Sequence, residues 1–93
     1  MLKPLFRIEE TTLVEGRGRV IAPALKLDEI EEKTKARFRA ILPDGQMLEL
    51  DGQVVTEHVR LTKGATRWDR VVLLQEDSPE LPVGTELLLF SKE

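Results

Sequence analysis

The chain has 93 residues, of which 41% are hydrophobic and 33% charged, and its formal net charge is −3. This length is that of one domain (residues 1–93), and the balance of apolar and charged residues is typical of a folded protein rather than a disordered one. The sequence contains no cysteine, which excludes disulfides and thiolate metal sites and agrees with a cytoplasmic location. No apolar run reaches the roughly 18 residues of a membrane-spanning helix, and the acidic charge counts against a general attraction to nucleic acids.

Apolar and polar residues alternate along much of the chain, as they do in half-buried β-strands. The first run begins at Phe6, and the second covers residues 17–25, where Val20 is expected to face inward. The clearest alternation runs over residues 34–42 and places Phe38 on the apolar face. These three runs predict three strands.

A strong turn follows at residues 43–46, because proline presets the backbone for a turn and glycine accepts a positive φ. We expect a strand over residues 47–50, a second turn or a bulge at the Asp-Gly pair 51–52, and a further strand over residues 53–61. In that strand, Val55 is expected to face the core and His58 to point away from it.

The last third of the chain begins with a polar loop predicted over residues 62–69. Residues 71–74 form a continuous apolar run, as expected of a central strand, and residues 87–90 form the last strand. Between them, residues 78–84 contain prolines that suit a rigid connection outside the sheet. The predicted core consists of Phe6, Ile8, Val20, Phe38, Leu42, Leu48, Leu50, Val72, Leu74, Leu87 and Leu89.

Residues 27–35 are the one segment that suits a helix. Asp28 could cap its N-terminus, and Glu29 and Lys33 have the i,i+4 spacing of a stabilising pair. A helix this short is marginal without tertiary support, so a short helix, a long turn and a strand extension all remain open.

About seven short strands separated by turns predict an all-β fold, because a βαβ sheet would need long amphipathic helices. We expect a small closed antiparallel β-barrel, or a barrel-like sandwich, with at most one or two short helices. Closure into a barrel would also remove the exposed strand edges that make small sheets aggregate.

The sequence offers little for catalysis or cofactor binding. It contains one histidine, His58, and two serines, Ser78 and Ser91, which is a poor basis for a nucleophilic triad or a histidine metal site. The acidic group at residues 28–32 is interleaved with lysines, which is typical of a solvated surface, and no phosphate-binding loop occurs. We therefore expect no enzymatic activity and neither a metal nor an organic cofactor.

Three segments resemble a known family. Residues 5–10 have the sequence Leu-Phe-Arg-Ile-Glu-Glu, residues 14–21 have Val-Glu-Gly-Arg-Gly-Arg-Val-Ile, and residues 81–87 have Leu-Pro-Val-Gly-Thr-Glu-Leu. Together they resemble the second domain of translational GTPases such as elongation factor Tu. The resemblance implies a small closed antiparallel β-barrel and contacts with the ribosome or RNA. It does not imply GTP hydrolysis, because these 93 residues contain no nucleotide-binding domain.

Two kinds of binding function follow from these observations. The chain is either a module for protein–protein interaction, including association with a second copy of itself, or a translation-factor-like module that binds RNA or the ribosome. We favour a protein partner, because the chain is acidic overall and has few aromatic residues on which bases could stack.

Positive charges nevertheless gather locally against the overall sign. Trp68 is the natural anchor of a protein interface, since tryptophan and arginine are enriched at binding hot spots, although it could equally cover one end of the barrel. The candidate contact residues are Arg17, Arg19, Arg37, Arg39, Arg67, Trp68 and Arg70.

Overall fold

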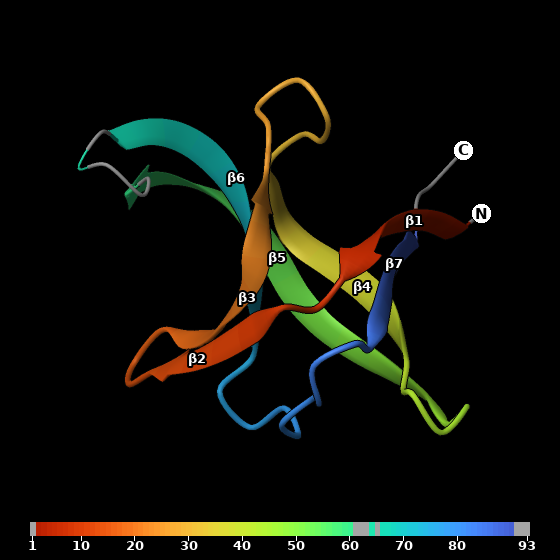
Figure 1. Ribbon diagram of the computed structural model, residues 1–93. Helices are drawn as coiled ribbons and strands as arrows, with labels where there is room; N and C mark the ends of the chain where they lie inside the picture. Colours follow the sequence, from red (N-terminus) through yellow and green to blue (C-terminus); the bar gives the residue numbers. More distant parts are fainter. Residues whose placement is uncertain (1, 61–63, 65, 91–93) are drawn as a thin grey trace.

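The computed structural model describes residues 2–60, 64 and 66–90, and this part of the chain forms seven β-strands and no helix (Figure 1). The strands are β1 (Leu2–Arg7), β2 (Glu10–Val14), β3 (Gly18–Leu25), β4 (Lys33–Ile41), β5 (Met47–Arg60), β6 (Thr66–Leu74) and β7 (Glu86–Phe90). Accordingly, no described segment is a helix that is long and apolar enough to cross a membrane. The predicted all-β fold is confirmed.

The strands form one antiparallel sheet in the order β1-β7-β4-β5-β6-β3-β2, and the sheet curls around its core (Figure 1). Its two edge strands, β1 and β2, follow each other in the chain and are not paired with each other. Between them, the N–H of Ile8 donates to the carbonyl of Thr85 at 2.8 Å, and the N–H of Glu9 donates to the carbonyl of Ala22 at 2.9 Å. The sheet is therefore strongly curved, while its closure into a barrel stays a prediction.

The core is made of aliphatic side chains around Phe38, which is fully buried. Of the predicted core, seven members are buried: Ile8, Phe38, Leu50, Val72, Leu74, Leu87 and Leu89. Phe6, Leu42 and Leu48 are partly buried and pack against it.

The prediction for Val20 is wrong, because its neighbour Ile21 is the core residue, with 1% of its surface exposed. The pairing of β3 with β6 explains the difference: Ile21 lies opposite Val72, and Val20 lies opposite Leu73. Since side chains alternate between the faces of a sheet, Ile21 joins Val72 inside and Val20 lies on the outer face with Leu73.

The same one-residue error occurs in β5, where Val54 rather than Val55 is buried in the core. The predicted turn or bulge at residues 51–52 is also wrong, because β5 runs through Gly52 without a break. Glycine is needed there for another reason, since a Cβ on Gly52 would lie 2.5 Å from the carbonyl oxygen of Leu73. The irregularity belongs to the partner strand, whose register shifts between Lys33 and Ala36.

Two further elements differ from the prediction. Residues 66–69, predicted as loop, belong to β6, whereas residues 61–63 and 65 of that predicted loop lie outside the described residues. Residues 10–14 form β2, which was not predicted as a separate strand because its residues lack clear alternation. The proline-containing connection at 78–84 lies outside the strands, as predicted.

Residues 26–32 form a turn rather than a helix and cross from β3 to β4. The turn is closed by Glu29, whose N–H donates to the Lys26 carbonyl at 3.0 Å and whose carboxylate accepts the Lys26 N–H at 2.7 Å. Ile30 is buried and joins the core. The local geometry is therefore set by Glu29 and Ile30 and not by capping at Asp28. We call residues 26–32 the crossing segment.

Candidate functional site

The outer ends of β5 and β6 extend beyond their neighbours in the sheet (Figure 1). The pairing of β4 with β5 stops at Val54, and that of β3 with β6 stops at Arg70. Residues 55–60 therefore pair with β6 alone, and residues 66–69 pair with β5 alone. We call these two stretches the projecting ribbon. A two-stranded ribbon is marginally stable alone, so this one depends on contacts where it leaves the sheet.

The crossing segment holds the base of the projecting ribbon. Nε of Arg70 donates to the carbonyl of Ile30 at 2.9 Å, and Nη1 of Arg70 donates to Oγ1 of Thr56, the residue opposite it on β5. The N–H of Thr56 in turn donates to the carboxylate of Glu32 at 3.0 Å. Hydrogen bonding from Thr56, through its side chain and its backbone, holds the pKa of Glu32 below its ordinary value, and the charge of Arg70 adds to this effect. One arginine, one hydroxyl and one carboxylate thus join the crossing segment to both strands.

Trp68 and His58 form the cross-strand pair that lies two residues closer to the tip of the ribbon than Thr56 and Arg70. They lie on the same face as Thr56 and Arg70, because residues two apart in a strand share a face. Their rings stack with centroids 4.7 Å apart and planes inclined by 22°. Trp68 is nevertheless 57% exposed, and of the large apolar side chains that are strongly exposed in the described part of the chain it is the sole aromatic one.

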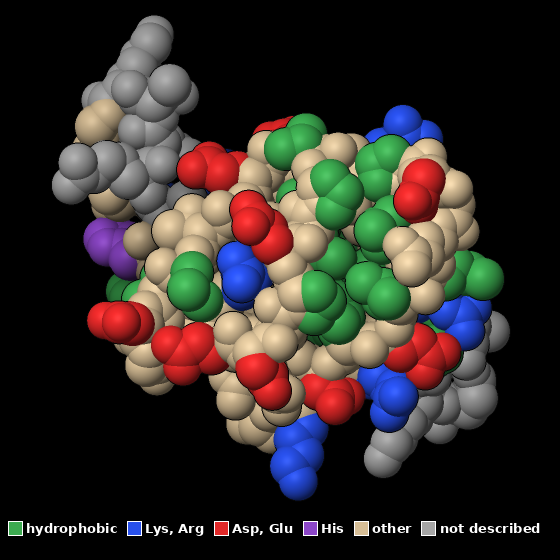
Figure 2. Space-filling view, turned by 90° about the horizontal axis from the view of Figure 1, so that it is seen from below, with side chains coloured by type: hydrophobic (Ala, Val, Ile, Leu, Met, Phe, Trp, Pro, Cys, Tyr) green, Lys and Arg blue, Asp and Glu red, His purple; other side chains and the backbone are tan. Residues whose placement is uncertain are grey.

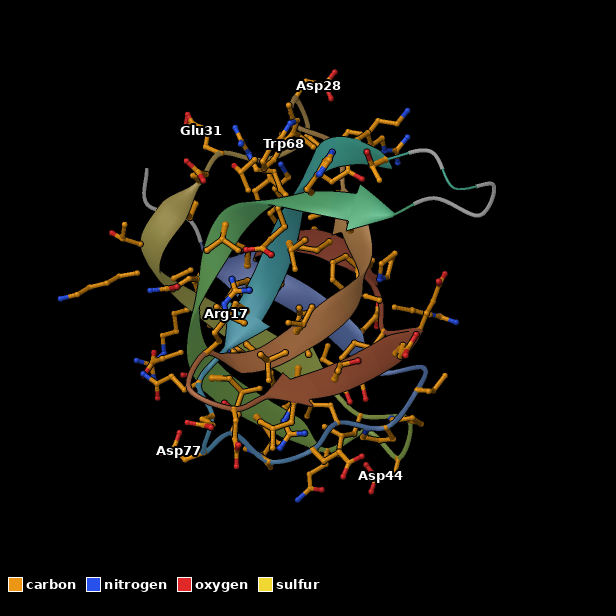
Figure 3. All side chains as sticks on the ribbon, turned by 90° about the vertical axis from the view of Figure 1, so that its left-hand side faces the viewer. Arg17, Asp28, Glu31, Asp44, Trp68 and Asp77 are labelled. Atoms are coloured by element: carbon orange, nitrogen blue, oxygen red, sulfur yellow. The ribbon has the colours of Figure 1, made fainter. Side chains whose placement is uncertain are left out.

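Two ion pairs lie on the opposite face of the ribbon. Arg17 makes a two-pronged contact with Glu57, with nitrogen–oxygen distances of 2.6 and 3.3 Å, and this hydrogen bonding raises the pKa of Arg17. Nε of Arg67 contacts the carboxylate of Asp69 at 2.9 Å, and the Asp69 side chain is almost completely buried. Figure 3 shows Arg17 lying over β5 and β6. Both arginines are therefore already matched by carboxylates of this chain.

Arg37 and Arg39 lie side by side on β4 and share one carboxylate, that of Glu49 on β5, at 3.2 and 3.1 Å. Hydrogen bonding from Arg39, supported by the charge of Arg37, holds the pKa of Glu49 below its ordinary value. The guanidinium of Arg39 also lies over the ring of Phe90, 5.2 Å from its centroid.

The Gly-Arg-Gly motif has a structural explanation. Arg17 lies in the turn between β2 and β3, and the half-buried Arg19 lies on β3, where Nη2 donates to the Ser78 carbonyl at 3.4 Å. Gly18 has a φ of 134°, and a Cβ at this position would overlap the carbonyl oxygen of Leu74. The motif therefore allows β3 to approach the end of β6 and needs no ligand to explain it.

The structure does not gather the seven candidate residues on one surface. Trp68 and Arg70 share the inner-facing side of the ribbon, whereas Arg17 and Arg67 lie on its other face. His58 and Glu32 belong to the site and were not predicted. The sequence shows the alternation in residues 53–61. The contacts of His58 and Glu32, however, depend on how β5, β6 and the crossing segment are placed against one another.

Two other surfaces of the molecule lack a comparable anchor. A groove of about 550 Å³ lies over Gly52 between Arg17 and Lys35, and Asp51 also lines it, so the groove carries both positive and negative charge. Figure 2 shows apolar side chains gathered among acidic ones at the end of the molecule opposite Trp68. In the described residues, no group of three or more histidine and carboxylate side chains could hold a metal ion. The projecting ribbon is the surface with the clearest anchor.

No protein-family model matches this sequence, and comparisons with curated proteins and with solved structures give no significant similarity. The geometry of the ribbon and of the crossing segment is therefore the basis for a functional proposal.

Proposed function

We propose that this chain is a non-catalytic β-barrel module that binds a protein partner through the projecting ribbon, with Trp68 as the anchor. The observation that carries the proposal is that the chain's single tryptophan is 57% exposed on a strand pair that extends beyond the sheet. Leaving so large an apolar surface in water is unfavourable, and tryptophan is among the residues most enriched at binding hot spots.

The anchor is held in place before any partner arrives. Trp68 stacks on His58, and the adjacent pair, Thr56 and Arg70, is hydrogen-bonded to the crossing segment. A side chain that is already ordered loses less conformational entropy on binding than a free one. This arrangement suits a recognition surface better than a chance exposure.

We further propose that the curved sheet functions as a closed barrel. The support is the pair of residues between the edge strands: Ile8 is hydrogen-bonded to Thr85 next to β7, and Glu9 to Ala22 in β3. Residues 2–14 would then act as one bent strand that closes the barrel. The second domain of translational GTPases, which three sequence segments resemble, is a barrel of this kind.

The arginines favour a protein over RNA. Arg17, Arg39 and Arg67 each contact a carboxylate of this chain, so phosphate groups would have to compete with those contacts. RNA or ribosome binding is the second candidate, and the stacked rings of His58 and Trp68 favour it, since aromatic side chains provide platforms for bases.

Affinity capture from a nuclease-treated lysate of the source organism tests the proposal with the immobilised chain. We expect a protein to be retained by the wild type, retained by the control variant Leu13→Ala, and lost with Trp68→Ala. Leu13 is a suitable control because it is 50% exposed on β2, away from the ribbon. Sedimentation of the purified chain at increasing concentration shows whether the partner is a second copy.

Two results decide between the candidates. Loss of the captured material on nuclease treatment would support RNA binding. Equal capture by Trp68→Ala and the wild type would contradict the ribbon as the contact surface.

A further inference from the structure

We infer that the partner presents a basic segment, and that one of its arginine or lysine side chains lies on the open face of Trp68 beside the carboxylates of Asp28 and Glu31. This inference rests on the proposed function, because it specifies the chemistry of the partner at the same surface.

The tryptophan ring has one face that His58 does not cover. His58 stacks on the other face of the indole in a nearly parallel arrangement, and Trp68 as a whole remains strongly exposed. The open face of an indole attracts cations, because its π-electrons give it a negative electrostatic potential. Arginine and lysine are the side chains that exploit this attraction.

The crossing segment lies at the base of the face that carries Trp68. Arg70 contacts the carbonyl of Ile30, and Trp68 lies two residues farther along the same face of β6. Because two residues of a strand span about 7 Å, Trp68 lies that far along β6 from the residue that contacts the crossing segment, to which Asp28 and Glu31 belong. Figure 3 shows Asp28, Glu31 and Trp68 at the same end of the molecule.

The four carboxylates of the crossing segment differ in whether they already have a partner in the described part of the chain. Glu29 accepts the N–H of Lys26, and Glu32 accepts the N–H of Thr56, so both serve the crossing segment itself. Asp28 and Glu31 are exposed, and no ion pair or side-chain hydrogen bond engages them within the described residues. They are therefore free to meet a positive charge from outside.

The balance of charge supports the same partner. Residues 26–33 contain four acidic side chains and two lysines, while Lys3 is bound to the Glu29 carbonyl and Arg70 to Ile30 and Thr56. A basic segment would gain from the carboxylates of Asp28 and Glu31, which a phosphate backbone or an acidic peptide would meet as like charges. A cation held between an aromatic face and two carboxylates gains from both at once.

Titration of the full chain with a hexa-arginine peptide tests the inference. Because Trp68 is the only tryptophan, its fluorescence reports binding at this surface directly. We expect a saturable change with hexa-arginine, and weaker binding by roughly tenfold in the variant Asp28→Asn/Glu31→Gln, because both negative charges that would face the peptide are removed. The matched control Asp77→Asn/Glu80→Gln removes the same charge from exposed residues outside the ribbon and crossing segment, with Asp77 at the opposite end of the molecule (Figure 3), and should change affinity by less than about threefold.

A second measurement uses a fluorescently labelled hexa-arginine peptide and its anisotropy, so that Trp68 itself can be changed. Trp68→Phe should keep most of the affinity and Trp68→Leu should lose it, because leucine is apolar but has no π-electrons. Equal affinities of these two variants would overturn the cation contact.

The outcomes separate the inference from the proposed function. If hexa-arginine leaves the fluorescence unchanged, or if the two acidic double variants weaken binding equally, the basic partner is contradicted even where protein capture still depends on Trp68. Tighter binding of hexa-glutamate or oligo-uridylate than of hexa-arginine would also overturn it. If Trp68→Ala has no effect on capture, the proposed function fails with it.

Discussion

The two halves of β5 show how one strand serves two purposes. Residues 47–54 pair with β4, and from Gly52 onward β5 also pairs with β6; the inward-facing side chains Leu50 and Val54 are buried in the core. Residues 55–60 pair with β6 alone, and His58, on the same face as Val54, lies in the exposed stack with Trp68. The face that forms the core inside the sheet therefore continues outside it as a surface open to a partner.

The crossing segment marks the boundary between these halves. Ile30 is buried at the end of the core, while its carbonyl accepts the hydrogen bond from Arg70 that fixes the ribbon. β5 and β6 thus extend past Ile30, which covers the end of the core. Beyond Ile30, the side of these strands that faces the core elsewhere is exposed. The recognition surface that we propose would therefore need no long binding loop and would be supported by the strands of the sheet.

The largest expected effect is a loss of stability that distinguishes the body of the sheet from the projecting ribbon. Phe38→Ala removes a fully buried ring that packs within the body of the sheet, and we expect it to lower the free energy of unfolding by about 3–5 kcal/mol. Trp68→Ala removes an exposed ring whose contact is one cross-strand pair, so its loss should be roughly 0.2–1 kcal/mol. Denaturant unfolding followed by circular dichroism measures both. Similar losses in the two variants would contradict the division into a stabilising body and a binding ribbon.

The sequence predicts the buried side of a strand well where apolar and polar residues alternate strictly. It predicts that side poorly where two adjacent residues are both apolar. The run over 34–42 alternates strictly, and it correctly predicted β4 and the burial of Phe38. In β3 and β5 the choice was between adjacent apolar residues, Val20 or Ile21 and Val54 or Val55. A strand considered alone does not decide between them. The decision comes from Val72 of β6, which pairs with both Ile21 and Val54.

The site was predictable only in part for a similar reason. Trp68 and Arg70 stood out by residue type, but Trp68 falls in the segment that was predicted to be a loop because its sequence is polar. The local excess of arginine was real, yet Glu49 and Glu57 neutralise Arg39 and Arg17 from other strands. Such pairings depend on strand register, which the charge pattern of one segment does not contain.

In the middle of β5, Gly52 lies close to β6, and a substitution there should have an intermediate effect on stability. A Cβ on Gly52 would lie 2.5 Å from the Leu73 carbonyl oxygen and 3.1 Å from a methyl group of Leu74, so Gly52→Ala forces β5 and β6 apart. We expect a loss of about 1–3 kcal/mol, the usual cost of overpacking. Gln53→Ala is the control, because Gln53 is the exposed next residue of the same strand. If both variants are as stable as the wild type, the close approach of β5 to β6 is not required for folding.

The smallest effect concerns the junction of ribbon and body in acid. The pKa of Glu32 is lowered by hydrogen bonding from Thr56, so its ionised form stabilises the folded junction; this stabilisation is complete above the ordinary value of 4.5 and disappears as the pH falls through the lowered pKa. We therefore expect Trp68 fluorescence to change below about pH 4.5 in the wild type. Glu32→Gln should already show the acid-like signal at neutral pH, with a flatter titration.

Glu49→Gln is the control. It removes a carboxylate whose pKa is lowered by Arg39 in the body of the sheet, so it should affect the acid stability of the whole domain but leave the Trp68 titration in place. If Glu49→Gln flattens the Trp68 titration and Glu32→Gln does not, the ribbon is held by the body as a whole and not by the chain of contacts from Arg70 through Thr56 to Glu32.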